Sequence, residues 1–367
     1  MAFTHGGDLY AIERAFGTPK EDIMDFSGNI NPLGVPQSVI KAVKESASDV
    51  TRYPDPEYAE LREAISKYAG VDAGGVIVGA GSTELISLYI RAVFRLERNR
   101  KKAVILCPAY SEYKREADNC GVESVLFPLK EENEFRAGME LLDAIDERTG
   151  VLIAANPNNP TGAAIERGQM TEIVEHCARL GVRVMIDETY AEFAEKDIIT
   201  ADLTRKFENL FTVRGVSKFF AAPGLRLGYA MCFDKAVLDE IKRIKDPWSV
   251  NTLAEAAGKV MFSDSEHINA SKKLVFAERA KLISVLSSWP EIKVYDSQAN
   301  FILIRLKENC LLTSTKIFEK MIARRALVRD CRSFQFLGDR FLRFCALGPK
   351  ENDMLLSALE GVIRRGE

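Results

Sequence analysis

The sequence predicts an α/β protein with a large domain on a mostly parallel sheet covered by helices, followed by a small C-terminal α+β domain. From residue 75 onward, short runs rich in β-branched residues alternate with amphipathic segments, which is the pattern of strands joined by helical crossovers. After residue 229 this alternation stops, and a long charged segment at 266–288 suits a connector between domains. We expect three parts, which are an N-terminal arm at 1–48, the large domain at 49–250 and the small domain at 251–367.

The expected elements follow from hydrophobic periodicity in chain order. In the arm we expect helices at 9–16 and 36–47, on either side of a polar, turn-rich stretch at 25–34. The large domain should contain strands at 75–79, 103–107, 151–155, 182–187 and 210–213 and helices at 82–96, 112–118 and 166–180. The rest should contain helices at 234–244, 251–262, 266–288, 313–325 and 351–364 and strands at 301–304 and 341–346.

Composition limits the class of protein. Of the 367 residues, 47% are hydrophobic and 28% are charged, and the formal net charge of −3 offers no general basic surface for nucleic acid. The seven cysteines are scattered and never form C-x-x-C, and the three histidines form no ligand-like pair, which favours a cytoplasmic protein without a metal site. We find neither an export signal nor a run of the roughly 18 apolar residues that a membrane span needs.

The segment 214–229 places a lysine and two arginines among apolar and small residues. Partial desolvation of Lys218 should lower its pKa and free its amine to form a Schiff base with a carbonyl compound. Arg226 follows a Pro-Gly turn, so its guanidinium can return toward the lysine and clamp a phosphate. These two functions together suggest pyridoxal phosphate, although a buried strand and turn with two snorkelling charges would have the same pattern.

Ligands of open parallel sheets bind beyond the carboxyl ends of the strands, so the residues that follow each strand are informative. The glycine turn at 79–84 opens a helix whose free N–H groups suit a phosphate, and Tyr110 offers an aromatic face to a planar ring. Asp187 ends a buried strand and needs a cationic partner, for which a protonated pyridine nitrogen is a candidate. Each motif has a structural alternative: a tight connection, a packing tyrosine and, for the amide-rich segment 156–162, a simple turn.

Taken jointly and in this order, these residues resemble the fold type I pyridoxal-phosphate enzymes of the aspartate aminotransferase superfamily, and the resemblance covers essentially the whole chain. It implies that Lys218 bonds covalently to the cofactor, that Asp187 pairs with the pyridine nitrogen, and that Tyr190 and Asn159 hold the phenolic oxygen. Tyr110 would stack on the ring. Relatives often have a hydroxyl residue where this chain has Gly215, so one phosphate contact is expected to be missing.

The resemblance also implies a homodimer with shared active sites. Within one subunit, the cofactor phosphate would be bound by the helix start and the lysine segment, namely by Gly81, Ser82, Thr83, Ser217 and Arg226. The partner subunit would contribute a tyrosine, Tyr53. In the small domain, Arg343 matches the arginine that binds the substrate carboxylate in the superfamily.

The nearest subgroup contains histidinol-phosphate aminotransferases and threonine-phosphate decarboxylases, which share Asn-Asn-Pro-Thr-Gly, the Ser-Lys segment and Arg-Tyr-Pro. The segments 4–7, 25–34 and 247–251 look more like the decarboxylases of cobalamin synthesis. For the substrate phosphate we favour Arg329 among four neighbouring arginines. His5 and Asn31 lie in the arm, where we expect them to close over the substrate, with helix capping as an alternative for Asn31.

We therefore expect decarboxylation of L-threonine O-3-phosphate to (R)-1-amino-2-propanol O-phosphate in cobalamin biosynthesis, with histidinol-phosphate transamination to 2-oxoglutarate as the alternative. Two other classes are disfavoured. A ligand-sensing module of a transcription regulator would need a DNA-binding domain, whereas only about 50 residues without a basic recognition helix precede the α/β pattern. A nicotinamide-dependent oxidoreductase is suggested by the Gly79-Ala-Gly turn alone.

Overall fold

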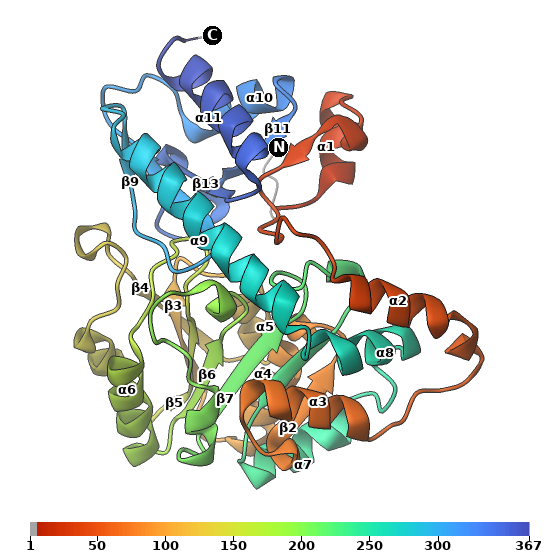
Figure 1. Ribbon diagram of the computed structural model, residues 1–367. Coiled ribbons are helices and arrows are strands. Elements are labelled where there is room, and N and C mark those ends of the chain that lie inside the picture. The colour runs from red at the N-terminus through yellow and green to blue at the C-terminus, as the bar shows by residue number, and fades with distance from the viewer. Residues whose placement is uncertain (1–5, 367) are drawn as a thin grey trace.

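The large domain of this computed structural model, which describes residues 6–366, contains a seven-stranded sheet, whose place in the molecule is shown in Figure 1. The strands stand in the order β2-β8-β7-β6-β5-β3-β4. Their bounds are β2 (Val76–Gly79), β3 (Lys102–Cys107), β4 (Glu123–Pro128), β5 (Thr149–Ala155), β6 (Arg183–Asp187), β7 (Leu210–Gly215) and β8 (Gly228–Met231). Neighbouring strands from β7 to β4 are parallel, and β8 is antiparallel to both of its neighbours. The expected mostly parallel sheet is confirmed.

Helices cover both faces of this sheet because the side chains of each strand alternate between two cores. Ala103 and Ile105 of β3 pack with α4 (Ser82–Leu96), α5 (Ser111–Asn119) and α7 (Lys235–Ile244). Val104 of β3 points to the opposite face, where α6 (Arg167–Arg179) packs. The central strands are therefore buried on both sides, whereas most side chains of the edge strand β4 are partly exposed.

The small domain is built on an antiparallel sheet in the order β12-β13-β10-β9. Its elements are β9 (Ile292–Val294), β10 (Phe301–Leu306), α10 (Ser314–Ala323), β11 (Ala326–Leu327), β12 (Arg329–Asp330), β13 (Phe341–Cys345) and α11 (Pro349–Ile363). The long helix α9 (Ser265–Ser287) connects it to the large domain, as Figure 1 shows. α8 (Thr252–Met261) packs on α2 (Gln37–Glu45) and α3 (Ala59–Ala69). We therefore propose a domain boundary within α9 rather than at residue 250.

The N-terminal arm joins the two domains. After α1 (Leu9–Phe16), the short strand β1 (Met24–Asp25) pairs in parallel with β11 of the small domain. A little further along, the backbone N–H of Asn31 donates to the carbonyl of Lys218 in the large domain (3.1 Å). The polar stretch between these contacts thus lies where the two domains meet.

Among the α-helices and strands of residues 6–366, seven were not expected: the helix α3 and the strands β1, β4, β8, β9, β11 and β12. The edge strand β4 ends in proline and is only partly buried, β8 is four residues long and begins with glycine, and α3 lies between the expected arm and the first strand. These three carry a weak periodic signal, and they are stabilised by their neighbours in the sheet or, for α3, by packing against α8 and β2.

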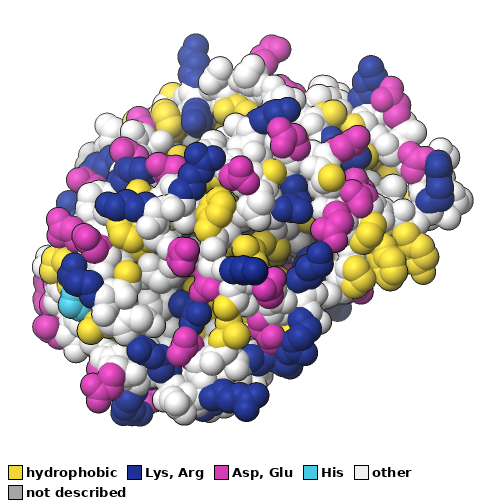
Figure 2. All heavy atoms as spheres, turned by 90° about the horizontal axis from the view of Figure 1, so that it is seen from below, with side chains coloured by type: hydrophobic (Ala, Val, Ile, Leu, Met, Phe, Trp, Pro, Cys, Tyr) yellow, Lys and Arg dark blue, Asp and Glu magenta, His cyan; other side chains and the backbone are white. Residues whose placement is uncertain are grey.

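The surface shown in Figure 2 carries lysine and arginine side chains interspersed with aspartate and glutamate, and hydrophobic side chains gather at one edge of this face. Within residues 6–366, no helix combines the length and the apolar character that crossing a bilayer requires.

Candidate active site

A cavity of about 320 Å³ lies where the carboxyl ends of the parallel strands face the small domain. It brings together residues from the large sheet, the arm and both β12 and β13. Twelve of the predicted site residues line it: Gly81, Ser82, Thr83, Tyr110, Asn159, Asp187, Tyr190, Ser217, Lys218, Arg226, Arg329 and Arg343.

Lys218 follows β7, and its Nζ donates a hydrogen bond to the carbonyl oxygen of Gly28 in the arm (2.7 Å). Burial among apolar groups lowers the pKa of this amine to about 8, and the positive charge of Arg343 acts in the same direction. A substantial fraction of the amine is therefore neutral just above neutral pH, as nucleophilic attack on a carbonyl requires.

Asp187 ends β6 with its carboxylate buried. One oxygen accepts the backbone N–H of Thr189 (2.9 Å), and the other accepts the hydroxyl of Tyr113 (2.6 Å). Burial raises the pKa of this carboxyl, while the two hydrogen bonds oppose the rise. Within residues 6–366 no lysine or arginine pairs with it, so the carboxylate is suited to accept a cationic N–H group from a ligand.

The start of α4 and Arg226 form a cradle for an anion. Gly81 has a φ of +90°, and the first turn of α4, with Ser82 and Thr83, presents free backbone N–H groups to the cavity. A Cβ on Gly81 would lie 2.5 Å from Nη2 of Arg226, which itself donates to the carbonyl of Ala80 (3.3 Å). Glycine at position 81 therefore lets the guanidinium approach the helix start, where a phosphate would be bound from two sides.

Two arginines of the small domain lie opposite each other across β12 and β13, with Arg329 paired to Arg343 in the strand register. Both side chains are buried and both line the cavity. Burial, with the neighbouring charge of Arg343, lowers the pKa of Arg329 to about 10, so the Arg329 guanidinium remains cationic at neutral pH. Two adjacent buried cations favour anionic ligands.

Each of these arginines is oriented by neighbouring groups. Arg343 donates to Oδ1 of Asn159 and to the carbonyl of Ser27 (2.6 Å), and its buried Nε has no hydrogen-bond partner among the described residues. Arg329 donates to the hydroxyl of Ser333 (2.7 Å) and lies over the ring of Phe334. The unsatisfied Nε of Arg343 is a further donor for an incoming anion.

The remaining predicted residues complete the cavity wall. The hydroxyl of Tyr110 lies 3.4 Å from that of Thr83. The hydroxyl of Tyr190 accepts a hydrogen bond from Nδ2 of Asn29 (3.2 Å). In the amide-rich turn, Asn158 donates to the carbonyl of Pro108 (3.0 Å) and stabilises the loop, whereas Asn159 lines the cavity. The turn thus serves both the structure and the site.

Two predicted residues lie outside the cavity, and a third is not among the residues that the structure describes. Asn31 does not line the cavity, because its amide donates to the carbonyl of Phe219 (2.6 Å) and the hydroxyl of Ser271 (2.7 Å) and joins the arm to α9, so its contact with the substrate stays a prediction. Tyr53 is 80% exposed beside Trp248 and outside the cavity, so its contact across a dimer stays a prediction. His5 lies outside the described residues.

Sequence reasoning missed several residues of the cavity. The arm contributes Ser27, Gly28 and Asn29, and the segment after β12 contributes Ser333 and Gln335. Asn29 has a left-handed backbone (φ 55°), a conformation that asparagine tolerates, and this turn directs its side chain to Tyr190 rather than to solvent. Tyr113 also went unnoticed, although it lies in the first turn of α5, only three residues after Tyr110 at the N-cap of that helix.

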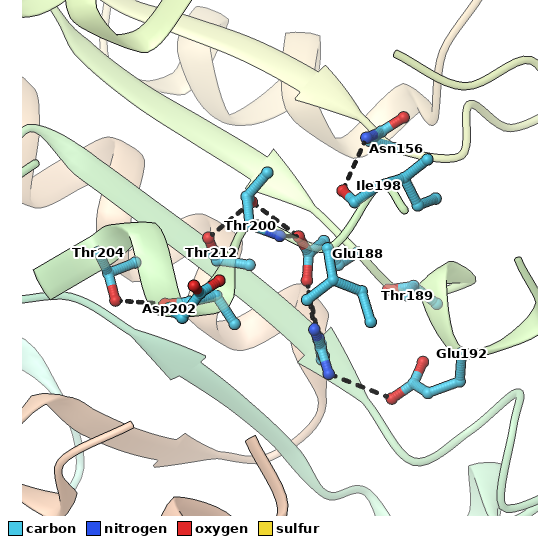
Figure 3. A network of polar contacts seen from close by, with 12 residues as sticks. Asn156, Glu188, Thr189, Glu192, Ile198, Thr200, Asp202, Thr204 and Thr212 are labelled. Carbon is cyan, nitrogen blue, oxygen red and sulfur yellow. Dashed lines mark hydrogen bonds and ion pairs between the residues drawn. The ribbon is translucent and has the colours of Figure 1, made fainter. Parts of the chain in front are cut away.

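A buried ionic network lies behind the site (Figure 3). Glu188, directly after Asp187, is fully buried and accepts Nε (2.9 Å) and Nη2 (2.6 Å) of Arg214 on β7. Its other oxygen accepts the hydroxyl of Thr200 (2.7 Å), and Glu192 lies 3.8 Å from Arg214. The network connects the segment that carries Asp187 and Tyr190 to the strand that leads to Lys218.

The chain matches the family of class I and II aminotransferases over residues 21–359. It belongs to this family. A relative from Caldanaerobacter subterraneus subsp. tengcongensis, provisionally named a threonine-phosphate decarboxylase, is 37% identical over 99% of this chain and 95% of its own. The threonine-phosphate decarboxylase of Salmonella typhimurium is 30% identical over 98% of this chain and 96% of its own. The crystal structure of the histidinol-phosphate aminotransferase from Clostridium acetobutylicum is 30% identical, covers 92% of this chain and 98% of its own, and superimposes with a TM-score of 0.84.

Pyridoxal phosphate is the cofactor of this aminotransferase family, and the cavity fits it. The buried carboxylate of Asp187, which lacks a cationic partner among residues 6–366, matches a protonated pyridine nitrogen. The amine of Lys218 matches the aldehyde, and the cradle at Gly81 and Arg226 matches the phosphate.

Proposed function

We propose that the protein decarboxylates L-threonine O-3-phosphate to (R)-1-amino-2-propanol O-phosphate in cobalamin biosynthesis. The observation that supports it is the facing pair Arg329 and Arg343, which offers two cationic groups in addition to the phosphate cradle at Gly81. This substrate carries a carboxylate and a phosphate at the same time, one anion for each arginine. The names of the two relatives described above support the same activity.

The residues of the chain divide the chemistry between them. When bound, pyridoxal phosphate supplies an electron sink that stabilises negative charge at the α-carbon of the substrate. Arg343 would bind the carboxylate and Arg329 the phosphate, which fixes the orientation of the bond to be broken. The bond between the α-carbon and the carboxylate would break, carbon dioxide would leave, and Lys218 would donate one proton to the α-carbon. The reaction therefore needs neither a keto acid nor an oxidant.

Histidinol-phosphate transamination remains the second candidate because the Clostridium enzyme shares 30% of its residues and nearly the whole fold. Histidinol phosphate has no carboxylate, so Arg343 would serve only the acid that exchanges the amino group. The decarboxylase substrate, by contrast, occupies both arginines in every turnover.

The experiment that separates them uses the purified, cofactor-loaded protein. Incubated with L-threonine O-3-phosphate alone, it should release one carbon dioxide for each amine formed. A parallel reaction contains histidinol phosphate with and without 2-oxoglutarate, and glutamate is measured. If glutamate formed only in the presence of 2-oxoglutarate and phosphothreonine released no carbon dioxide, the result would contradict the decarboxylase and support the transaminase.

We also propose that Arg329 selects phosphorylated substrates. Replacing it by glutamine should raise KM for phosphothreonine about 10- to 100-fold, because a charge-assisted hydrogen bond is worth about 1.5–3 kcal/mol. The kcat/KM for unphosphorylated threonine should hardly change. Arg332→Gln provides the control, since Arg332 is more exposed and lies near Asp330. If Arg329→Gln lowered kcat/KM equally for phosphothreonine and for threonine, Arg329 would not be the residue that binds the substrate phosphate.

The assembly that we propose is a homodimer in the cytoplasm. The exposed ring of Tyr53, packed against Trp248 (4.7 Å between centroids), is available to the active site of a partner subunit. All seven cysteines are free thiols, which agrees with a reducing compartment.

A further inference from the structure

Tyr113 is the side-chain donor to the carboxylate that faces the cofactor. It lies in the first turn of α5, with its side chain 1% exposed, and its hydroxyl donates to Oδ2 of Asp187 across 2.6 Å. The other oxygen of Asp187 is bound by the backbone N–H of Thr189. Among the described residues, each carboxylate oxygen therefore accepts one hydrogen bond, and the lone pairs that remain are available to a ligand.

The same tyrosine contacts the ring-stacking residue. Tyr110 is the N-cap residue of α5, and its ring meets that of Tyr113 edge to face with centroids 5.7 Å apart. The start of α5 thus positions both the aromatic face expected above the cofactor and the carboxylate expected at its nitrogen. A shift of Tyr113 would move both contacts together.

We propose that Tyr113 is a positioning residue that holds Asp187 as an oriented carboxylate, so that Asp187 keeps the ring nitrogen of pyridoxal phosphate protonated. The proposal rests on the family's cofactor and holds for either substrate discussed above. Its physical basis is that Asp187 is buried, which favours the neutral acid, whereas a donated hydrogen bond favours the ionised form. An ionised Asp187 attracts the N–H of the ring, and a neutral one loses most of that attraction.

The test compares two cofactors that differ at one atom. Dissociation constants of pyridoxal phosphate and of 1-deazapyridoxal phosphate, in which carbon replaces the ring nitrogen, are measured on the cofactor-free protein and on Tyr113→Phe. We expect Tyr113→Phe to bind pyridoxal phosphate about tenfold more weakly, as for the loss of a hydrogen bond to a charged group. Binding of the deaza analogue should change by less than about twofold, because this analogue has no ring N–H group that could donate a hydrogen bond to Asp187.

A matched control is Tyr89→Phe. Tyr89 is a buried tyrosine of α4 whose hydroxyl contacts the carbonyl of Val184 (3.5 Å), outside the cavity. This variant should leave the ratio of the two dissociation constants unchanged. Equal weakening of both cofactors in Tyr113→Phe would mean that the hydroxyl only supports packing and would overturn the proposal, as would no weakening at all.

The pair can also be tested through Asp187 itself. In an Asp187→Asn background the carboxylate is absent, so adding Tyr113→Phe should no longer alter the ratio of the two dissociation constants. A change of the same size as in the wild-type background would show that Tyr113 acts by another route. Because each comparison is a ratio within one protein, partial destabilisation of a variant does not decide the outcome.

Discussion

Replacing Lys218 by alanine should remove covalent attachment of the cofactor and lower turnover of the proposed substrate by about 10²- to 10⁴-fold or more. The amine lines the cavity, its pKa is lowered to about 8, and it is the group placed to move a proton at the α-carbon. Borohydride treatment followed by mass spectrometry should find the reduced cofactor on Lys218 of the wild-type protein and on no residue of the variant. Carbon dioxide release measures the loss of turnover.

Lys245 provides the matched control. Burial lowers the pKa of its amine too, but it lies over the ring of Tyr58 and outside the cavity. Lys245→Ala should therefore retain the adduct at Lys218 and most of the activity. Full turnover by Lys218→Ala, or an adduct on a different lysine, would contradict both the site and the function proposed here.

The large sheet could be predicted because its strands are buried on both faces. Runs such as Val151–Ala155 consist of apolar residues alone, and the helices between them alternate regularly with these runs. The elements that escaped prediction lack this signature: β8 is held between β2 and β7 by their ladders, and its sequence of four residues has no period to read. The antiparallel direction of β8 depends on its pairing with β2 and β7, so it cannot be predicted from these four residues alone.

Site residues at strand ends could be predicted for a related reason, since topology alone places the ends of β3, β5, β6 and β7 along one edge. No comparable topological rule places the residues of the N-terminal arm. Asn29 and Asn31 are two residues apart in the same polar stretch, yet only Asn29 reaches the cavity, because its left-handed backbone turns its side chain toward Tyr190. Asn31 instead finds partners on α9, more than 200 residues away in sequence. No local pattern distinguishes the two.

The sequence also did not show that Glu188, Glu192 and Arg214 pair in a buried network. Among the proposed substitutions, we expect the one at Arg214 to lower stability most. Replacing it by methionine should lower the free energy of unfolding by about 3–5 kcal/mol, because removing one member of a buried ionic network leaves an uncompensated charge. Glu188 would lose both hydrogen bonds from the guanidinium, and Glu192 would lose its nearby positive charge (Figure 3). Urea denaturation of the cofactor-free protein measures this difference.

The loss should also depend on pH. Burial raises the pKa of Glu192 in the folded protein, and Arg214 opposes this rise, so the pKa should increase further in Arg214→Met. A carboxyl whose pKa is higher in the folded than in the unfolded state reduces stability as pH rises from its unfolded value, about 4.3, through the folded one. The deficit of Arg214→Met relative to the wild type should therefore be larger at about pH 8 than at about pH 5.

A surface pair serves as the control for both measurements. Arg148 is exposed and pairs with Glu123 at 2.6 Å, where water solvates either charge once its partner is removed. Arg148→Met should change the free energy of unfolding far less than Arg214→Met, and with little dependence on pH. If the two variants lost the same stability, the buried network would contribute no more than a solvated pair. It would then not be the element that fixes the segments carrying Asp187 and Lys218.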